Sequence, residues 1–140
     1  MIGLYDESDD LHSRAAAHFS TYFGQIPNQM IVAWPILYES ISTKMVRQRK
    51  NFEALDKGWR ALRAHGQLLL LDDQEFRESA MDECLAEVSR PPRHYRALSL
   101  TDRVLRGVLA SADTRVDLFI TFNPQDFVDV CRQVGRRMVS

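Results

Sequence analysis

Apolar positions along the chain recur mostly at helical spacing, with a few short continuous apolar runs between them. Sets of apolar residues three or four positions apart follow one another from end to end, which predicts a succession of amphipathic helices. The sets are Ala15, Phe19 and Tyr22 or Phe23; Leu37, Ile41 and Met45; Phe52, Leu55, Trp59 and Leu62; Phe76, Ala80, Cys84 and Val88; Val104, Leu105, Val108 and Leu109; and Phe127, Val130, Cys131 and Val134.

The continuous runs predict strands. They are MIVAW (30–34), QLLLL (67–71) and DLFIT (117–121). Short runs without alternation are typical of strands that are buried on both faces, as in a parallel sheet. Because they alternate with the helices, we expect an α/β layered fold in which the three runs form neighbouring parallel strands of one sheet. The 140 residues, 45% of them hydrophobic, fit one compact domain over 1–140.

Local signals predict where several helices begin. Pro35 suits the first turn of a helix, because the N–H that proline lacks has no helical partner there. Ser99 or Thr101 is a suitable cap for the following helix, and Asn123 before Pro124 is a good cap followed by a good first residue.

Composition excludes several classes of protein. Lys and Arg (18) nearly balance Asp and Glu (19), so a nucleic-acid site would have to be local. The two cysteines, Cys84 and Cys131, lie in apolar helical patterns and support neither a disulfide framework nor a zinc site. Neither a signal peptide nor an apolar run of membrane-spanning length is present, so we expect a cytoplasmic protein without a membrane partner.

Three oxygen-bearing side chains occupy equivalent places in the predicted fold. Glu39 lies one turn into the helix after strand 30–34, Asp102 lies in the first turn of a helix over 101–112, and Asn123 follows strand 117–121. Ligands of open α/β sheets bind beyond the carboxyl ends of the strands. A cluster of carboxylate and amide oxygens there would suit Mg²⁺ or Mn²⁺.

At this point the sequence resembles the PIN domain family, in particular VapC toxin-like ribonucleases. The segments IVAWPILYES (31–40), ALSLTDRVLRG (97–107) and DLFITFNPQDF (117–127) resemble the three later blocks of that family. The segment MIGLYDESDDLHSRAAAHF (1–19) resembles the helix that follows the first block. The resemblance spans nearly the whole chain, through the order and spacing of the blocks rather than through one unique motif.

The resemblance implies a three-layer sandwich, with a central parallel sheet flanked by helices, and an acidic cluster that holds a metal. Glu39 would match the second acidic residue of the family, Asp102 the third, and Asn123 a variable fourth position for which Asp126 is a weaker candidate. The implied activity is cleavage of single-stranded RNA with Mg²⁺ or Mn²⁺. The implied partners are an antitoxin protein and a second copy in a homodimer.

One departure concerns the first block, a strand that ends in an aspartate and would lie in the middle of the sheet. In the register given above, the chain begins inside the helix that follows this strand, so the strand and its aspartate are absent. An alternative register makes MIGLY the strand and Asp6 the acid. It is disfavoured because DESDDLHSRA matches the loop and next helix of the family, and because the interval from Asp6 to Glu39 is short.

A basic segment before the Asp102 helix is the candidate RNA contact. Arg90, Arg93 and Arg96 would bind phosphates, with Tyr95 stacking on a base and Arg103 adding a cation from the helix. The alternative is an ordinary solvated loop.

Structural explanations compete with the proposed site. Glu39 and Asp102 would each be favoured by a helix dipole if they only lay in first turns. Asp72 and Asp73 resemble the acidic pair of receiver domains, but capping of the next helix explains them better. The main rival to the nuclease is a non-catalytic PIN-like module that binds RNA or protein, which the absent aspartate and the amide at Asn123 favour.

Overall fold

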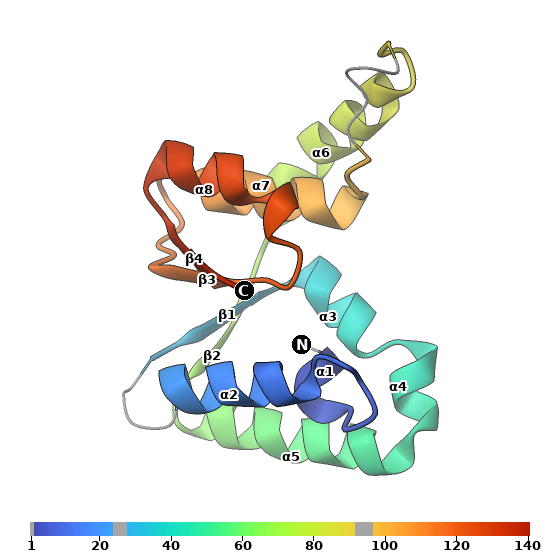
Figure 1. The fold of residues 1–140 in the computed structure, drawn as a ribbon, viewed down its shortest axis with the longest axis vertical. Helices are drawn as coiled ribbons and strands as arrows, with labels where there is room; N and C mark the ends of the chain where they lie inside the picture. Colours follow the sequence, from blue (N-terminus) through green and yellow to red (C-terminus); the bar gives the residue numbers. More distant parts are fainter. Residues whose placement is uncertain (1, 24–27, 92–96) are drawn as a thin grey trace. The chain divides into compact units, whose positions relative to one another are not determined.

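The computed structural model describes residues 2–23, 28–91 and 97–140, and the chain forms two compact units, Met1–Asp72 and Asp73–Ser140 (Figure 1). Unit 1 contains α1 (Ile2–Tyr5), α2 (His12–Phe23), β1 (Met30–Ala33), α3 (Trp34–Ser40), α4 (Thr43–Arg47), α5 (Arg49–Ala64) and β2 (Leu68–Leu71). Unit 2 contains α6 (Gln74–Glu87), α7 (Leu100–Ala110), β3 (Leu118–Ile120), the 3₁₀ turn η2 (Pro124–Asp126), α8 (Val128–Val134) and β4 (Arg137–Val139).

Each unit has its own parallel pair of strands. In unit 1, β1 pairs with β2, with Met30 opposite Leu68. In unit 2, β3 pairs with β4, with Leu118 opposite Arg137. The mixed α/β class and the three predicted strands are confirmed, and β1 and β2 are parallel as predicted. The prediction that the three runs share one sheet is wrong for the residues that the structure describes, because β3 pairs there with β4, a short strand that the apolar pattern did not predict.

The core of unit 1 lies between the strand pair and α5. Val32 of β1 is buried together with Met45 of α4 and with Leu55 and Trp59 of α5. The predicted face of α5 is therefore confirmed. The face that runs through Leu37, Ile41 and Met45 is divided instead, because α3 ends at Ser40 and Ser42 adopts an extended conformation before α4 begins.

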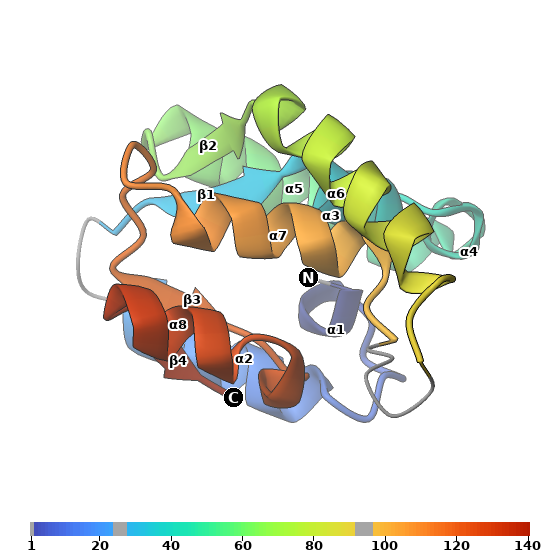
Figure 2. The same cartoon turned by 90° about the horizontal axis from the view of Figure 1, so that it is seen from above.

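Unit 2 has a second core and a helix pair that lies beside it. Leu109 of α7 is buried with Phe127, Val130 and Cys131, and α6 packs against α7 (Figure 2). The pattern of α6 is only partly confirmed, since Ala80 is buried but Val88 is 83% exposed. Glu87, one position earlier, is buried in its place because it forms an ion pair with α7.

Two local signals at helix starts are confirmed. Pro35 lies in the first turn of α3, and Ser99 is the N-cap of α7. Among the residues that the structure describes, no helix is both long enough and apolar enough to cross a membrane.

Candidate functional site

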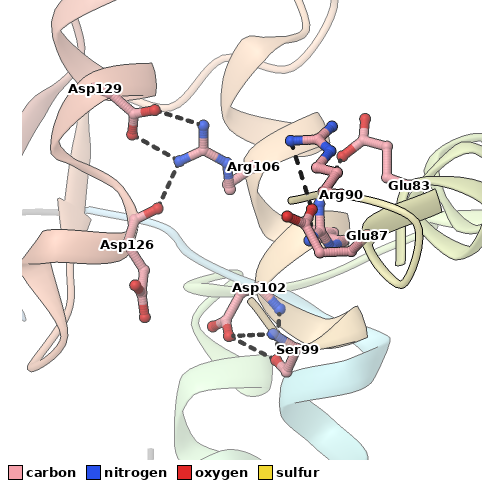
Figure 3. A network of polar contacts seen from close by, with 9 residues as sticks. Glu83, Glu87, Arg90, Ser99, Asp102, Arg106, Asp126 and Asp129 are labelled. Carbon is pink, nitrogen blue, oxygen red and sulfur yellow. Dashed lines mark hydrogen bonds and ion pairs between the residues drawn. The ribbon is translucent and has the colours of Figure 1, made fainter. Parts of the chain in front are cut away.

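Asp102 is held in a fixed orientation at the start of α7. The Ser99 hydroxyl accepts a hydrogen bond from the Asp102 backbone N–H at 3.1 Å, and Asp102 Oδ2 accepts one from the Ser99 backbone N–H, also at 3.1 Å. The Ser99 hydroxyl in turn donates to Asp102 Oδ2 at 2.6 Å (Figure 3). This reciprocal arrangement is a capping box, which satisfies backbone donors of the first helical turn. Capping is therefore one complete reason for an aspartate at this position.

The capping box leaves the second oxygen of the carboxylate available. All the hydrogen bonds to the Asp102 side chain reach Oδ2, so within the described part of the chain Oδ1 has no hydrogen-bond partner. The side chain is half-buried, and Oδ1 is held in place by the same bonds that hold Oδ2. Fixing one oxygen of a carboxylate while the other stays available is how supporting hydrogen bonds orient metal ligands.

Asn123 and Asp126 lie together in the turn that follows β3. The Asn123 backbone N–H donates to Thr121 Oγ1 at 3.1 Å, and the Asp126 N–H donates to the Asn123 carbonyl at 3.3 Å. The Asn123 side-chain amide donates to Asp126 Oδ2, so the two side chains are in direct contact. Pro124 begins η2 as expected, but the Asn123 side chain does not cap it.

Arg106 connects this turn to the Asp102 helix. It follows Asp102 by one helical turn, so the two residues lie on the same face of α7. Its Nη1 donates to the Asp126 carbonyl oxygen at 2.5 Å, which brings Asp126 and Asn123 to the face that carries Asp102. Figure 3 shows the carboxylates of Asp102 and Asp126 on the same side of this guanidinium group.

Asp129 neutralises the charge of Arg106. Nη1 and Nη2 of Arg106 donate to the two carboxylate oxygens of Asp129 at 2.7 and 2.8 Å. Together, the side chains of Arg106, Asp102, Asp126 and Asp129 carry a formal charge of −2. The local field therefore favours a cation, although the whole chain is nearly neutral.

Glu39 lies in unit 1, near the end of α3, with an exposed side chain. Asp102, Asn123 and Asp126 thus all lie in unit 2, where Arg106 links their two segments, while Glu39 belongs to the other unit. Since Glu39 is the next-to-last residue of α3, it does not lie in the first turn, and the helix dipole gives it no stabilisation. The helix-dipole explanation therefore applies to Asp102 but not to Glu39.

The predicted RNA contacts fall into three groups. Arg90 is exposed at the end of α6 and pairs with Glu87 at 3.6 Å. Arg93, Tyr95 and Arg96 lie outside the described residues. Arg103 was predicted to face RNA, but its side chain is only 5% exposed.

Arg103 joins α7 to α6 instead. It donates to Glu87 Oε2 at 2.9 Å and to Glu83 Oε2 at 3.3 Å. Burial lowers the pKa of the Arg103 guanidinium group, but the hydrogen bonds to Glu87 and Glu83, together with nearby negative charge, outweigh this effect and raise the pKa overall. Arg103 is therefore a residue of the helix interface, which corrects its assignment as a phosphate contact.

Sequence reasoning missed Arg106 and Asp129. The spacing of four residues from Asp102 was a usable signal for Arg106, because it places the cation beside a candidate ligand. No such signal existed for Asp129, which is 23 residues further along the chain. Across the described ranges, no group of three or more His, Cys, Asp or Glu side chains is arranged to hold a metal ion.

Comparisons of the chain with protein-family models, with curated proteins and with solved structures find no match.

Proposed function

We propose that the chain is a PIN-type ribonuclease domain that uses Mg²⁺ or Mn²⁺ to cleave single-stranded RNA. One observation carries the proposal: Arg106 joins the turn of Asn123 and Asp126 to the helix face of Asp102. The three candidate ligands, Asp102, Asn123 and Asp126, are residues that the sequence pattern had selected. A homodimer and a protein antitoxin belong to the same proposal.

The donor set in unit 2 fits such a cation. Mg²⁺ prefers oxygen ligands, and it is usually bound by one or two carboxylates together with water and substrate phosphate. Asp102 Oδ1 and the side chains of Asp126 and Asn123 are oxygen donors of this kind. A bound divalent cation supplies an activated water and stabilises charge on the scissile phosphate. In this proposal Asp102 and Asp126 hold the cation, and Asn123 orients Asp126.

The non-catalytic alternative has its own supporting observation. The described residues contain no cluster of three metal-binding side chains, and Asp102 already has a structural role in its capping box. A PIN-like module that binds RNA or protein without cleaving it is the second candidate function.

The deciding variant is Asp102→Asn, because an amide oxygen still accepts from Ser99 while the negative charge is lost. We expect Mn²⁺ to raise the melting temperature of the wild-type chain, since a ligand that binds only the native state stabilises it. Asp102→Asn should abolish this rise, and with it any cleavage of single-stranded RNA. Asp113→Asn is the matched control, because Asp113 is an exposed aspartate of the same unit and should leave both unchanged.

The results separate the two candidates. If Mn²⁺ does not stabilise the wild type, and RNA still binds without being cleaved, the non-catalytic module is the correct function. If Asp102→Asn retains full cleavage, Asp102 is not a ligand and the assignment of the site is wrong.

A further inference from the structure

The turn that carries Asn123 and Asp126 is anchored on two sides. At its end, Phe127 is buried in the core of unit 2 beside Leu109 and Val130. On the other side, Arg106 of α7 reaches the Asp126 carbonyl oxygen and the Asp129 carboxylate together. The guanidinium group thus bridges the last residue of η2 and the first turn of α8 (Figure 3).

The geometry of this bridge is more specific than that of a typical surface ion pair. Exposed pairs with a single contact contribute little, because holding two long side chains in place costs entropy. Here the planar guanidinium group makes two parallel hydrogen bonds to Asp129 and a third to a backbone carbonyl, with Arg106 only 21% exposed. An ammonium group cannot reproduce this fork, so lysine is not an equivalent residue at this position.

We propose that Arg106 is a positioning residue that holds Asp126 and Asn123 at the face of Asp102, with Asp129 fixing the orientation of its guanidinium group. This inference rests on the proposed function, because it concerns the same cation site. Arg106 itself contacts a backbone carbonyl and a carboxylate outside the proposed ligand set, so it acts through Asp126. Asp129 also neutralises the charge that Arg106 would otherwise present to an incoming cation.

The test combines Mn²⁺ affinity with hydrogen exchange on the full chain. In Arg106→Ala the Mn²⁺ dissociation constant should rise about tenfold or more, the range typical of residues that orient metal ligands. The exchange of the Asp126 and Phe127 amides, which donate to Asn123 and Pro124, should also become faster in the metal-free protein. Arg106→Lys should give a dissociation constant and exchange rates between those of the wild type and Arg106→Ala. Lysine keeps the positive charge, but its ammonium group cannot reproduce the fork of hydrogen bonds.

Arg115→Ala is the matched control. Arg115 forms an exposed pair with Asp117 in the same unit, so its removal should change neither measurement. Circular dichroism establishes that each variant is folded, and Arg106→Lys carries the test if Arg106→Ala is not.

Each outcome decides one question. If the wild type binds Mn²⁺ and the Arg106 variants bind it equally well, Arg106 is not a positioning residue and the proposed function is unaffected. If the affinity falls but the two amides exchange at the wild-type rate, Arg106 does not hold this turn in place, and the inference is overturned. If the wild type binds no Mn²⁺, the proposed function fails and the positioning role fails with it.

Discussion

Each unit packs an aromatic side chain from one helix against a glycine of another, but the two contacts differ in which part of the side chain meets the glycine. In unit 1, a Cβ added at Gly58 of α5 would lie 2.8 Å from the Tyr5 hydroxyl oxygen of α1. In unit 2, a Cβ added at Gly107 of α7 would lie 3.0 Å from Phe76 Cδ1 and 3.2 Å from Phe76 Cβ of α6.

The difference shows which helix pair is the more rigid. Tyr5 meets Gly58 with the far end of its side chain, and it belongs to a helix of only four residues. Phe76 meets Gly107 close to its own backbone, on a helix of 14 residues, so it moves only if α6 moves. Since α7 also carries Asp102 and Arg106, the proposed site is built on the more firmly packed of the two pairs.

Removing one partner of the buried ion pair between α6 and α7 should cause the largest loss in the free energy of unfolding. Arg103→Ala leaves Glu87 only 5% exposed and without its closest cation, and removing one partner of a buried pair typically costs about 3 kcal/mol or more. Urea unfolding should show a loss of this size. Replacing both partners, as Arg103→Met with Glu87→Leu, should recover most of it, because no unpaired buried charge then remains.

Arg60→Ala is the control for this measurement, since its pair with Asp56 on α5 is exposed. It should leave the unfolding midpoint unchanged. A loss equally small for Arg103→Ala would show that the α6–α7 pair does not depend on its buried charges.

The two glycines give the next largest effect and test the comparison directly. Replacing glycine by alanine in a helix normally gains about 0.5–1 kcal/mol. For Gly107→Ala we expect a net loss of about 1–2 kcal/mol, because forcing extra volume into a packed contact costs roughly 1–3 kcal/mol. Gly58→Ala is the matched variant and should change stability by less than about 0.5 kcal/mol, since the Tyr5 ring can turn aside. Equal losses in thermal unfolding would mean that the two contacts are equally rigid.

The sequence predicted those parts of the fold that depend on short-range periodicity. The face of α5 could be found because Leu55, Trp59 and Leu62 recur at helical intervals and are all buried. Val88 also fits the period of α6, yet it is exposed, because a pattern of apolar residues does not reveal that buried Glu87 pairs with Arg103.

Features that depend on residues far apart along the chain could not be predicted from the sequence. The three residues of β4, one of them a charged arginine, form a strand only because β3 pairs with them. Asp102 was identified from its place in the first helical turn, but the same place serves the capping box, so position alone did not separate the two roles. Arg106 contacts Asp126 and Asp129, which lie 20 and 23 residues later in the chain. A helical period relates only residues three or four positions apart, so it does not predict these contacts.

The smallest effect on stability concerns Asp6, the buried carboxylate of unit 1, and it is lost in acid. Asp6 is 1% exposed, and its Oδ1 accepts from the Ser8 hydroxyl at 2.6 Å and from Asn51 Nδ2 at 3.1 Å. The hydrogen bond from the Ser8 side chain is the main cause that lowers the pKa of Asp6 below its ordinary value of 3.8; burial opposes it, and the Lys44 ammonium group assists it.

A lowered pKa in the folded state means that the Asp6 carboxylate stabilises the fold above the unfolded-state pKa of 3.8, and that this contribution is lost as the pH falls through the lower folded-state value. Asp6→Asn should therefore be less stable than the wild type at neutral pH, and the difference should shrink below about pH 4. Urea unfolding at a series of pH values measures this, with the exposed neighbour variant Asp10→Asn as the control that should follow the wild type. If the Asp6→Asn and wild-type curves stay parallel down to about pH 2, the ionised Asp6 carboxylate does not hold α1 and its following turn against Asn51 and Lys44. The buried charges of Arg103 and Glu87 would then stabilise a helix pair in unit 2, whereas the charge of Asp6 would not stabilise unit 1.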